Sequence, residues 1–113
     1  MTDTPPPPPA PATAPTMVML TFYCAPGDRD AVAEAIRALC ANPIHLREEL
    51  VIGLDFSDAR TAEQVLGELD RAAVDVSVPQ GEAEAVIAAV GASRRKLPVR
   101  WHITPLLARG RLS

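Results

Sequence analysis

Basic side chains are concentrated at the C-terminal end of this chain. Residues 94–113 contain five arginines, one lysine and no acidic residue, so this segment carries a charge of +6. The whole chain has a net charge of −3, so the remaining residues carry −9. Guanidinium groups bind phosphate and carboxylate through paired, charge-assisted hydrogen bonds. The segment therefore predicts a site for a small anion, pairing with an acidic surface of a second subunit, or a solvated basic face.

A more scattered set of residues has the chemistry of metal ligands: Cys24, His45 and His102. Thiolate and imidazole are ligands that copper and zinc prefer. Because the chain has two cysteines, a four-cysteine zinc site is excluded. This set makes a small metal-binding or metal-buffering protein the alternative function. The plainer interpretation of His102 is a histidine packed in a subunit interface.

Three common catalytic motifs are absent from the sequence: the G-x-S-x-G nucleophile elbow, the G-x-x-x-x-G-K-[ST] P-loop and the H-E-x-x-H zinc-protease motif. The loop at residues 25–30 contains two aspartates and is too acidic for a phosphate-cradling loop of the acylphosphatase kind. The adjacent Glu48 and Glu49 are interpreted as the polar rim of a strand. We therefore expect a binding or regulatory protein, not an enzyme.

Hydrophobic periodicity predicts the strands that position these groups. An alternation with period two predicts four of them, with a helix over residues 46–51 as the competing interpretation of the second. The predicted strands cover residues 17–24, 44–56, 72–78 and 97–104.

Helical spacing of apolar residues predicts the helices. One begins after Asp28, which can cap it, and another covers residues 83–90 with Gly91 just past its end. A capping-box pattern predicts a short third helix over residues 62–69. The first helix carries one apolar stripe expected in the core: Val32, Ala35, Ile36, Leu39 and Cys40.

The order strand, helix, strand, strand, helix, strand predicts the fold. Two right-handed crossovers place both helices on one face of a four-stranded antiparallel sheet. The result is a ferredoxin-like βαββαβ sandwich of the α+β class. This fold hosts many unrelated activities, so it does not name a function.

The second face of the sheet stays uncovered in this fold. Burying such a face between subunits stabilises by ~25 cal/mol per Å² of apolar area, before association costs. We therefore expect a homo-oligomer built through the open sheet face. The side chains predicted on it are Met17, Met19, Thr21, Tyr23, Val51, Arg100, His102 and Thr104.

The chain is expected to divide into a proline-rich, disordered tail at residues 1–16 and one domain at residues 17–113. It has no secretory signal pattern and no apolar run near the ~20 residues of a membrane helix. We therefore expect a cytoplasmic protein without direct membrane insertion. Its acidic net charge and the lack of a nucleic-acid motif predict no binding to nucleic acid.

Two segments carry a family resemblance. The first is Thr61–Gly67, with the sequence TAEQVLG, and the second is Trp101–Pro105 (WHITP) followed by Gly110–Leu112 (GRL). Together they resemble a family of short, uncharacterised PII-like bacterial proteins of the CutA/PII superfamily. Genes of that family are often found with heavy-metal efflux systems of the resistance–nodulation–division type.

The resemblance implies a ferredoxin-like homotrimer that binds a small effector, an anion or a metal ion, between subunits. It also implies signalling to a partner protein, with an efflux component as the candidate. The chain lacks the glycine–lysine phosphate loop of nucleotide-binding PII proteins, so the resemblance does not imply ATP binding. The cofactor stays unknown. The implied effector or signalling residues are Glu63, Gln64, Gly67, Thr104, Arg109, Gly110 and Arg111.

Overall fold

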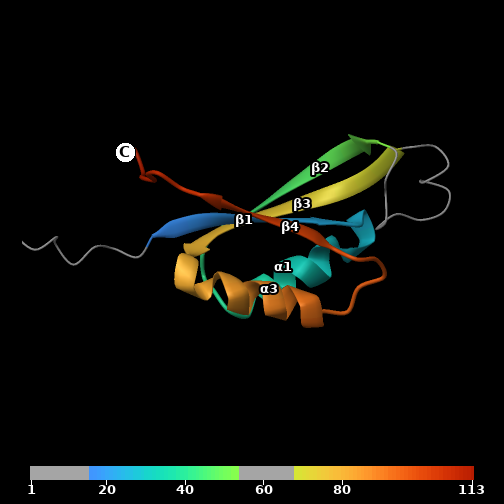
Figure 1. Cartoon of the computed structure of the whole chain (residues 1–113), viewed down its shortest axis with the longest axis horizontal. Helices are drawn as coiled ribbons and strands as arrows, with labels where there is room; N and C mark the ends of the chain where they lie inside the picture. The colour runs from blue at the N-terminus through green and yellow to red at the C-terminus, as the bar shows by residue number, and fades with distance from the viewer. Residues whose placement is uncertain (1–15, 54–67) are drawn as a thin grey trace, which may run out of the picture.

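The computed structural model describes residues 16–53 and 68–113. Figure 1 shows one sheet with a layer of helices against one of its faces. Along the chain the elements are strand β1 (Met17–Cys24), the 3-10 turn η1 (Pro26–Asp28), helix α1 (Arg29–Arg37), strand β2 (Ile44–Ile52), strand β3 (Glu68–Pro79), the 3-10 turn η2 (Gln80–Glu82), helix α3 (Ala83–Ala92) and strand β4 (Arg100–Pro105).

The four strands lie in the order β2-β3-β1-β4, and every neighbouring pair is antiparallel. Helices α1 and α3 cover the same face of this sheet (Figure 1). The predicted ferredoxin-like α+β fold is therefore confirmed. In this order β1 and β3 are the central strands, and β2 and β4 are the two edges.

The core lies between the helical layer and one face of β1 and β3. Alternate residues of each strand point into it, and the largest fully buried side chains are Phe22, Leu20 and Ile36. Because these alternate positions are all apolar, the pleat of the strands separates one apolar face from one mixed face. The core consists of Val18, Leu20, Phe22, Cys24, Val32, Ile36, Ala72, Val74, Val76, Val78, Ala83, Val86 and Val90.

Asp28 was predicted to cap the helix that follows it. It does precede α1, but its side chain does not cap this helix. Its side chain makes no capping hydrogen bond and is almost fully buried. The carboxylate instead accepts hydrogen bonds from the backbone N–H of Lys96, at 3.0 and 3.1 Å, and of Leu97, at 3.1 Å. It therefore ties the turn after β1 to the segment between α3 and β4, because two backbone amides satisfy a carboxylate that has little access to water.

The start of β3 corrects the prediction of a helix over residues 62–69. Residues 68 and 69 belong to β3 and pair with Ile52 and Val51 of β2. Strand pairing over nine positions outweighs a local capping signal, since tertiary contacts override intrinsic propensity. The rest of that predicted helix, residues 54–56 of the second predicted strand, and the predicted disordered tail up to residue 15 lie outside the described residues.

Smaller boundary predictions are also corrected. Gly91 lies inside α3 rather than after it, and Ser93 is the residue that ends the helix. Leu39 follows α1 and is 51% exposed, so it does not belong to the buried stripe, whereas Cys40 after it is half-buried against the core. β4 begins at Arg100 and includes Pro105 as its last residue. In the described parts of the chain, no helix is long and apolar enough to cross a membrane.

Candidate functional site

The open face of the sheet carries a polar row that crosses all four strands. Strand register places His45 opposite Asp75, Asp75 opposite Thr21, and Thr21 opposite His102. Thr21 Oγ1 donates a hydrogen bond to Asp75 Oδ1 at 2.6 Å, and Arg47 forms an ion pair with the other carboxylate oxygen. Asp75 is only 8% exposed, so these contacts satisfy a carboxylate that has little access to water.

His102 lies at the β4 end of this row and is exposed. Its ring meets the Tyr23 ring edge to face, with centroids 5.2 Å apart and planes inclined by 67°. Such pairs orient both rings. The alternation predicted for β1 is correct, and Met17, Met19 and Tyr23 are half-buried on this face.

A hollow of about 420 Å³ lies between the C-terminal tail and the open face of the sheet, beyond the end of β4. The tail starts at Leu106, whose N–H donates to the Met17 carbonyl oxygen at 3.2 Å. Further along, Arg109 Nη1 donates to Ser77 Oγ at 3.3 Å. The lining of the hollow consists of Met19, Pro43, His45, Ser77, Arg109, Gly110 and Arg111.

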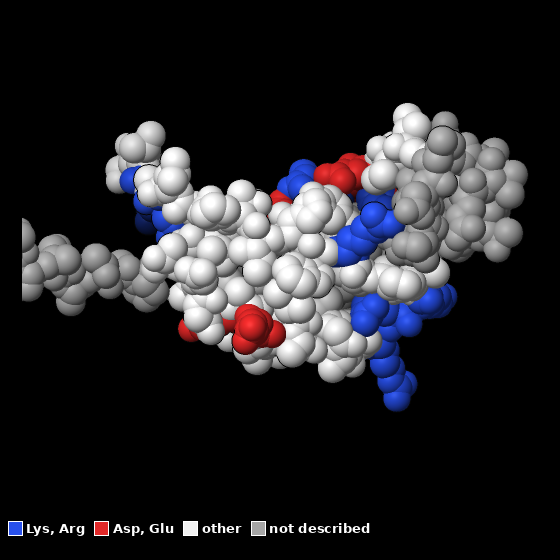
Figure 2. All heavy atoms as spheres, viewed as in Figure 1, with Lys and Arg blue, Asp and Glu red and all other residues white. Residues whose placement is uncertain are grey.

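The charge of this lining is positive. It contains the guanidinium groups of Arg109 and Arg111 and no carboxylate, and His45 and Ser77 add an imidazole and a hydroxyl. Figure 2 shows that basic side chains gather at the tail, on the left, and again at the opposite end of the sheet. Guanidinium and hydroxyl donors facing one hollow favour a small anion and disfavour a cation.

The structure brings together only part of the predicted effector set. Arg109, Gly110 and Arg111 line the hollow, and Thr104 lies opposite Met19 on the same face. Ser77 was missed by sequence reasoning, although its alternation with Asp75 was a signal for this face. Three predicted members lie outside the described residues: Glu63, Gln64 and Gly67.

The three predicted metal ligands are divided between the two faces of the sheet. Cys24 is fully buried under the helices, and its Sγ donates to the Ala72 carbonyl oxygen at 3.7 Å. Burial, reinforced by the Asp28 carboxylate, raises the pKa of the Cys24 thiol to about 11. His45 and His102 face the other way. In residues 16–53 and 68–113, no three side chains of metal-ligating type form a group that could hold an ion.

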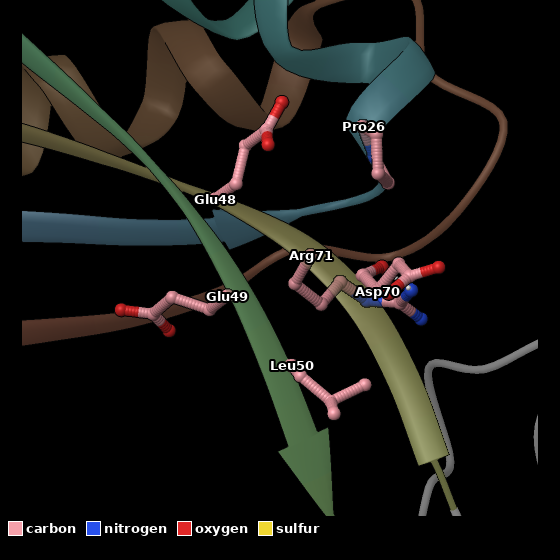
Figure 3. A pocket seen from close by; sticks show the side chains of 6 residues that line it. All are labelled: Pro26, Glu48, Glu49, Leu50, Asp70 and Arg71. Atoms are coloured by element: carbon pink, nitrogen blue, oxygen red, sulfur yellow. Dashed lines mark hydrogen bonds between the residues drawn. The ribbon is translucent and has the colours of Figure 1, made fainter.

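A second hollow of about 440 Å³ lies at the other end of the sheet. Figure 3 shows its lining, with Glu48 pointing toward the helical layer and Glu49 away from it. Arg71 is almost fully buried here, and its Nη1 donates to the Asp70 carbonyl oxygen at 2.7 Å. With three carboxylates beside one guanidinium, this lining has the opposite charge to that of the tail hollow.

Comparison with known proteins identifies relatives of the chain. The model of a family described as "Protein of unknown function (DUF3240)" matches residues 14–113. No curated protein sequence matches the chain.

Two solved structures share the fold. The crystal structure of a DUF3240 family protein from Shewanella baltica OS155 superposes with a TM-score of 0.67 at 17% identity, covering 87% of this chain and 98% of that one. A Bacillus cereus protein related to NIF3 superposes with a TM-score of 0.65 at 16% identity, covering 90% of this chain and 28% of that one. At such identities the likeness extends to the fold alone.

Proposed function

The chain belongs to the DUF3240 family, and from this premise we propose that it is a PII-like homotrimeric regulatory protein that senses a small anion. The observation that carries the proposal is the tail hollow on the open sheet face. There the Arg109–Ser77 hydrogen bond holds two arginines of the tail over residues of β1, β2 and β3.

The effector is an anion rather than a metal ion in this proposal. Two guanidinium groups repel a cation, and they match the paired oxygens of phosphate and carboxylate groups. The tail closes one wall of the hollow, so a bound anion would neutralise its charges and hold it against β3. Tail position is therefore the signal that a partner protein receives.

The assembly and the partner rest on the sequence resemblance to PII-like proteins. We take the chain as a homotrimer and its partner as a protein component of a heavy-metal efflux system of the resistance–nodulation–division type. A cytoplasmic location is part of the same proposal, in keeping with two free cysteines.

Isothermal titration with inorganic phosphate, pyrophosphate and citrate tests the anion site. At least one of these probes should bind, and replacing both tail arginines (Arg109→Gln with Arg111→Gln) should weaken binding about 100-fold, about tenfold for each lost charge-assisted contact. The matched control is Arg94→Gln, which removes an exposed arginine outside the lining and should leave affinity unchanged.

Two results would overturn the proposal. The first is equal affinity in the double variant and the wild type, since the hollow would then not be the site. The second is binding of Zn²⁺ or Cu²⁺ that is lost in His102→Ala and unaffected by the arginine changes, which would favour the metal-buffering alternative.

A further inference from the structure

The connection between α1 and β2 contributes one wall of the tail hollow. It passes through Asn42 and Pro43 just before β2 begins at Ile44. Pro43 lines the hollow. Asn42 is half-buried, and its Nδ2 donates a hydrogen bond to the backbone carbonyl oxygen of Ser77 at 2.6 Å. A side chain outside the sheet thus binds the backbone of a β3 residue whose own side chain lines the hollow.

A missing backbone donor explains this contact. In the register of β2 and β3, Ile44 lies opposite Val76, so Pro43 is the next residue in line with Ser77. Proline has no N–H and cannot donate to a neighbouring strand. Ser77 is half-buried, and a carbonyl group left without a donor at such a place costs free energy. The Asn42 amide therefore takes the place of the backbone N–H that Pro43 lacks.

Ser77 holds the tail through its second polar group. Its carbonyl oxygen accepts from Asn42, and its Oγ accepts from Arg109 Nη1 at 3.3 Å. On the other side of β3, Ser77 pairs with Met19 of β1, which also lines the hollow. The hydrogen bonds of Asn42, Ser77 and Arg109 thus run from the α1–β2 connection through β3 to the tail, and we call these two bonds the latch.

The latch fixes the tail near its middle. The first contact of the tail is the hydrogen bond from Leu106 N–H to the Met17 carbonyl oxygen, and the latch lies three residues further on. Arg111 lines the same hollow two residues beyond the latch. Because Ser77 already holds the Arg109 guanidinium, this long side chain loses less conformational freedom when an anion binds. The latch should therefore raise the affinity of the hollow for an anion.

We infer that Asn42 and Ser77 are the positioning residues of the tail hollow. Asn42 is not among the residues that line the hollow, so it acts through Ser77, and Ser77 acts through Arg109. The inference rests on the proposed function, because it takes the tail hollow as the anion site. Since the three residues act in series, the effects of substituting them should not add.

Isothermal titration of the full-length chain with inorganic pyrophosphate tests the latch as a double-mutant cycle. Ser77→Ala should weaken binding about fivefold, the effect of one hydrogen bond, and Asn42→Ala about threefold. Arg109→Gln should weaken binding about tenfold. Adding Ser77→Ala to Arg109→Gln should cause no further loss, because the partner of the Ser77 hydroxyl is then already absent.

Two matched variants separate positioning from a general loss of structure. Ser77→Thr keeps the hydroxyl and should bind pyrophosphate as tightly as the wild type. Ser93→Ala removes a half-buried hydroxyl outside the lining of the hollow, where Ser93 Oγ donates to the Val90 carbonyl oxygen at 2.6 Å. This variant should leave the affinity unchanged.

Proteolysis measures the position of the tail without any ligand. Trypsin cleaves after arginine, and cleavage requires a segment that leaves the folded structure. Mass spectrometry should show that the rate of cleavage between Arg109 and Gly110 rises about fivefold in Ser77→Ala and about threefold in Asn42→Ala. Ser77→Thr should be cleaved at the wild-type rate.

The possible failures bear differently on the latch and on the proposed function. Wild-type affinity and cleavage in Ser77→Ala, or a loss in the double variant equal to the product of the two single losses, would overturn the inference. An effect of Ser77→Ala without one of Asn42→Ala would overturn the role of Asn42. If the wild type binds none of pyrophosphate, phosphate and citrate, the proposed function fails, and faster cleavage of both variants would then still support the latch.

Discussion

The two faces of β1 differ in what their side chains do, although their residues alternate along a single strand. On the helix side, Val18, Leu20, Phe22 and Cys24 are almost completely buried. On the open side, Thr21 makes a hydrogen bond to Asp75, and its neighbours on that face are half-buried. The comparison indicates that apolar burial stabilises one face, whereas paired polar groups hold the strands together on the other.

The largest expected effect comes from adjacent alanine substitutions on these two faces. Phe22→Ala should lower the free energy of unfolding by about 3–5 kcal/mol, because it leaves a cavity in a closed core. Tyr23→Ala should cost about 1 kcal/mol, because its ring is half-buried on the open face. Urea denaturation of both variants measures the difference, and equal losses would contradict the division between the faces.

Alkaline pH should lower the stability of the fold through Cys24, the last residue of the buried face of β1. Its pKa rises from an ordinary value of 9.0 to about 11 because burial disfavours the thiolate. The folded chain therefore holds this proton more tightly than the unfolded chain. Below pH 9 the free energy of unfolding is unaffected by this difference. As the pH rises from 9 toward 11, the free energy of unfolding should fall by roughly 2–3 kcal/mol in total.

Denaturation curves of the wild type and Cys24→Ala from pH 8 to pH 11 isolate this effect. The difference between the two proteins should shrink with rising pH, since other groups titrate equally in both. A difference that stays constant would show that the thiol ionises normally in the fold.

The smallest expected effect tests the polar row of the open face. Thr21→Val removes the hydroxyl that donates to Asp75 but keeps the shape of the side chain. The unfolding free energy should fall by about 1–2 kcal/mol, since a nearly buried carboxylate loses a donor. Thermal melts of both variants measure this loss. The control is Thr104→Val, which changes an exposed threonine on the same face and should have almost no effect.

Local alternation in the sequence is sufficient to predict the two faces of β1, because a pleated strand projects successive side chains to opposite sides. It also predicts that His102 and Thr104 share the open face. These predictions succeed because they depend on neighbouring positions alone. The fold follows from a different rule, because two right-handed crossovers place both helices on one face of the sheet.

Long-range contacts could not be predicted in this way. The Arg109–Ser77 hydrogen bond joins residues 32 positions apart, and it forms only because the tail after β4 and the end of β3 lie close together in the fold. Asp28 fits the pattern of a helix cap, but its partners are the amides of Lys96 and Leu97. Cys24 and His45 were grouped by chemistry, and the pleat places them on opposite faces. Each outcome depends on segments that meet only in the finished fold.

The position of β1 in the sheet has a consequence for synthesis of the chain. It is made first, yet both strands that flank it, β3 and β4, come from the second half of the sequence. The backbone amides that donate to the Asp28 carboxylate, at residues 96 and 97, are likewise made late. A nascent chain on the ribosome must therefore expose both edges of this apolar strand until β3 has been made, and one edge until β4 has been made, which favours aggregation and chaperone binding.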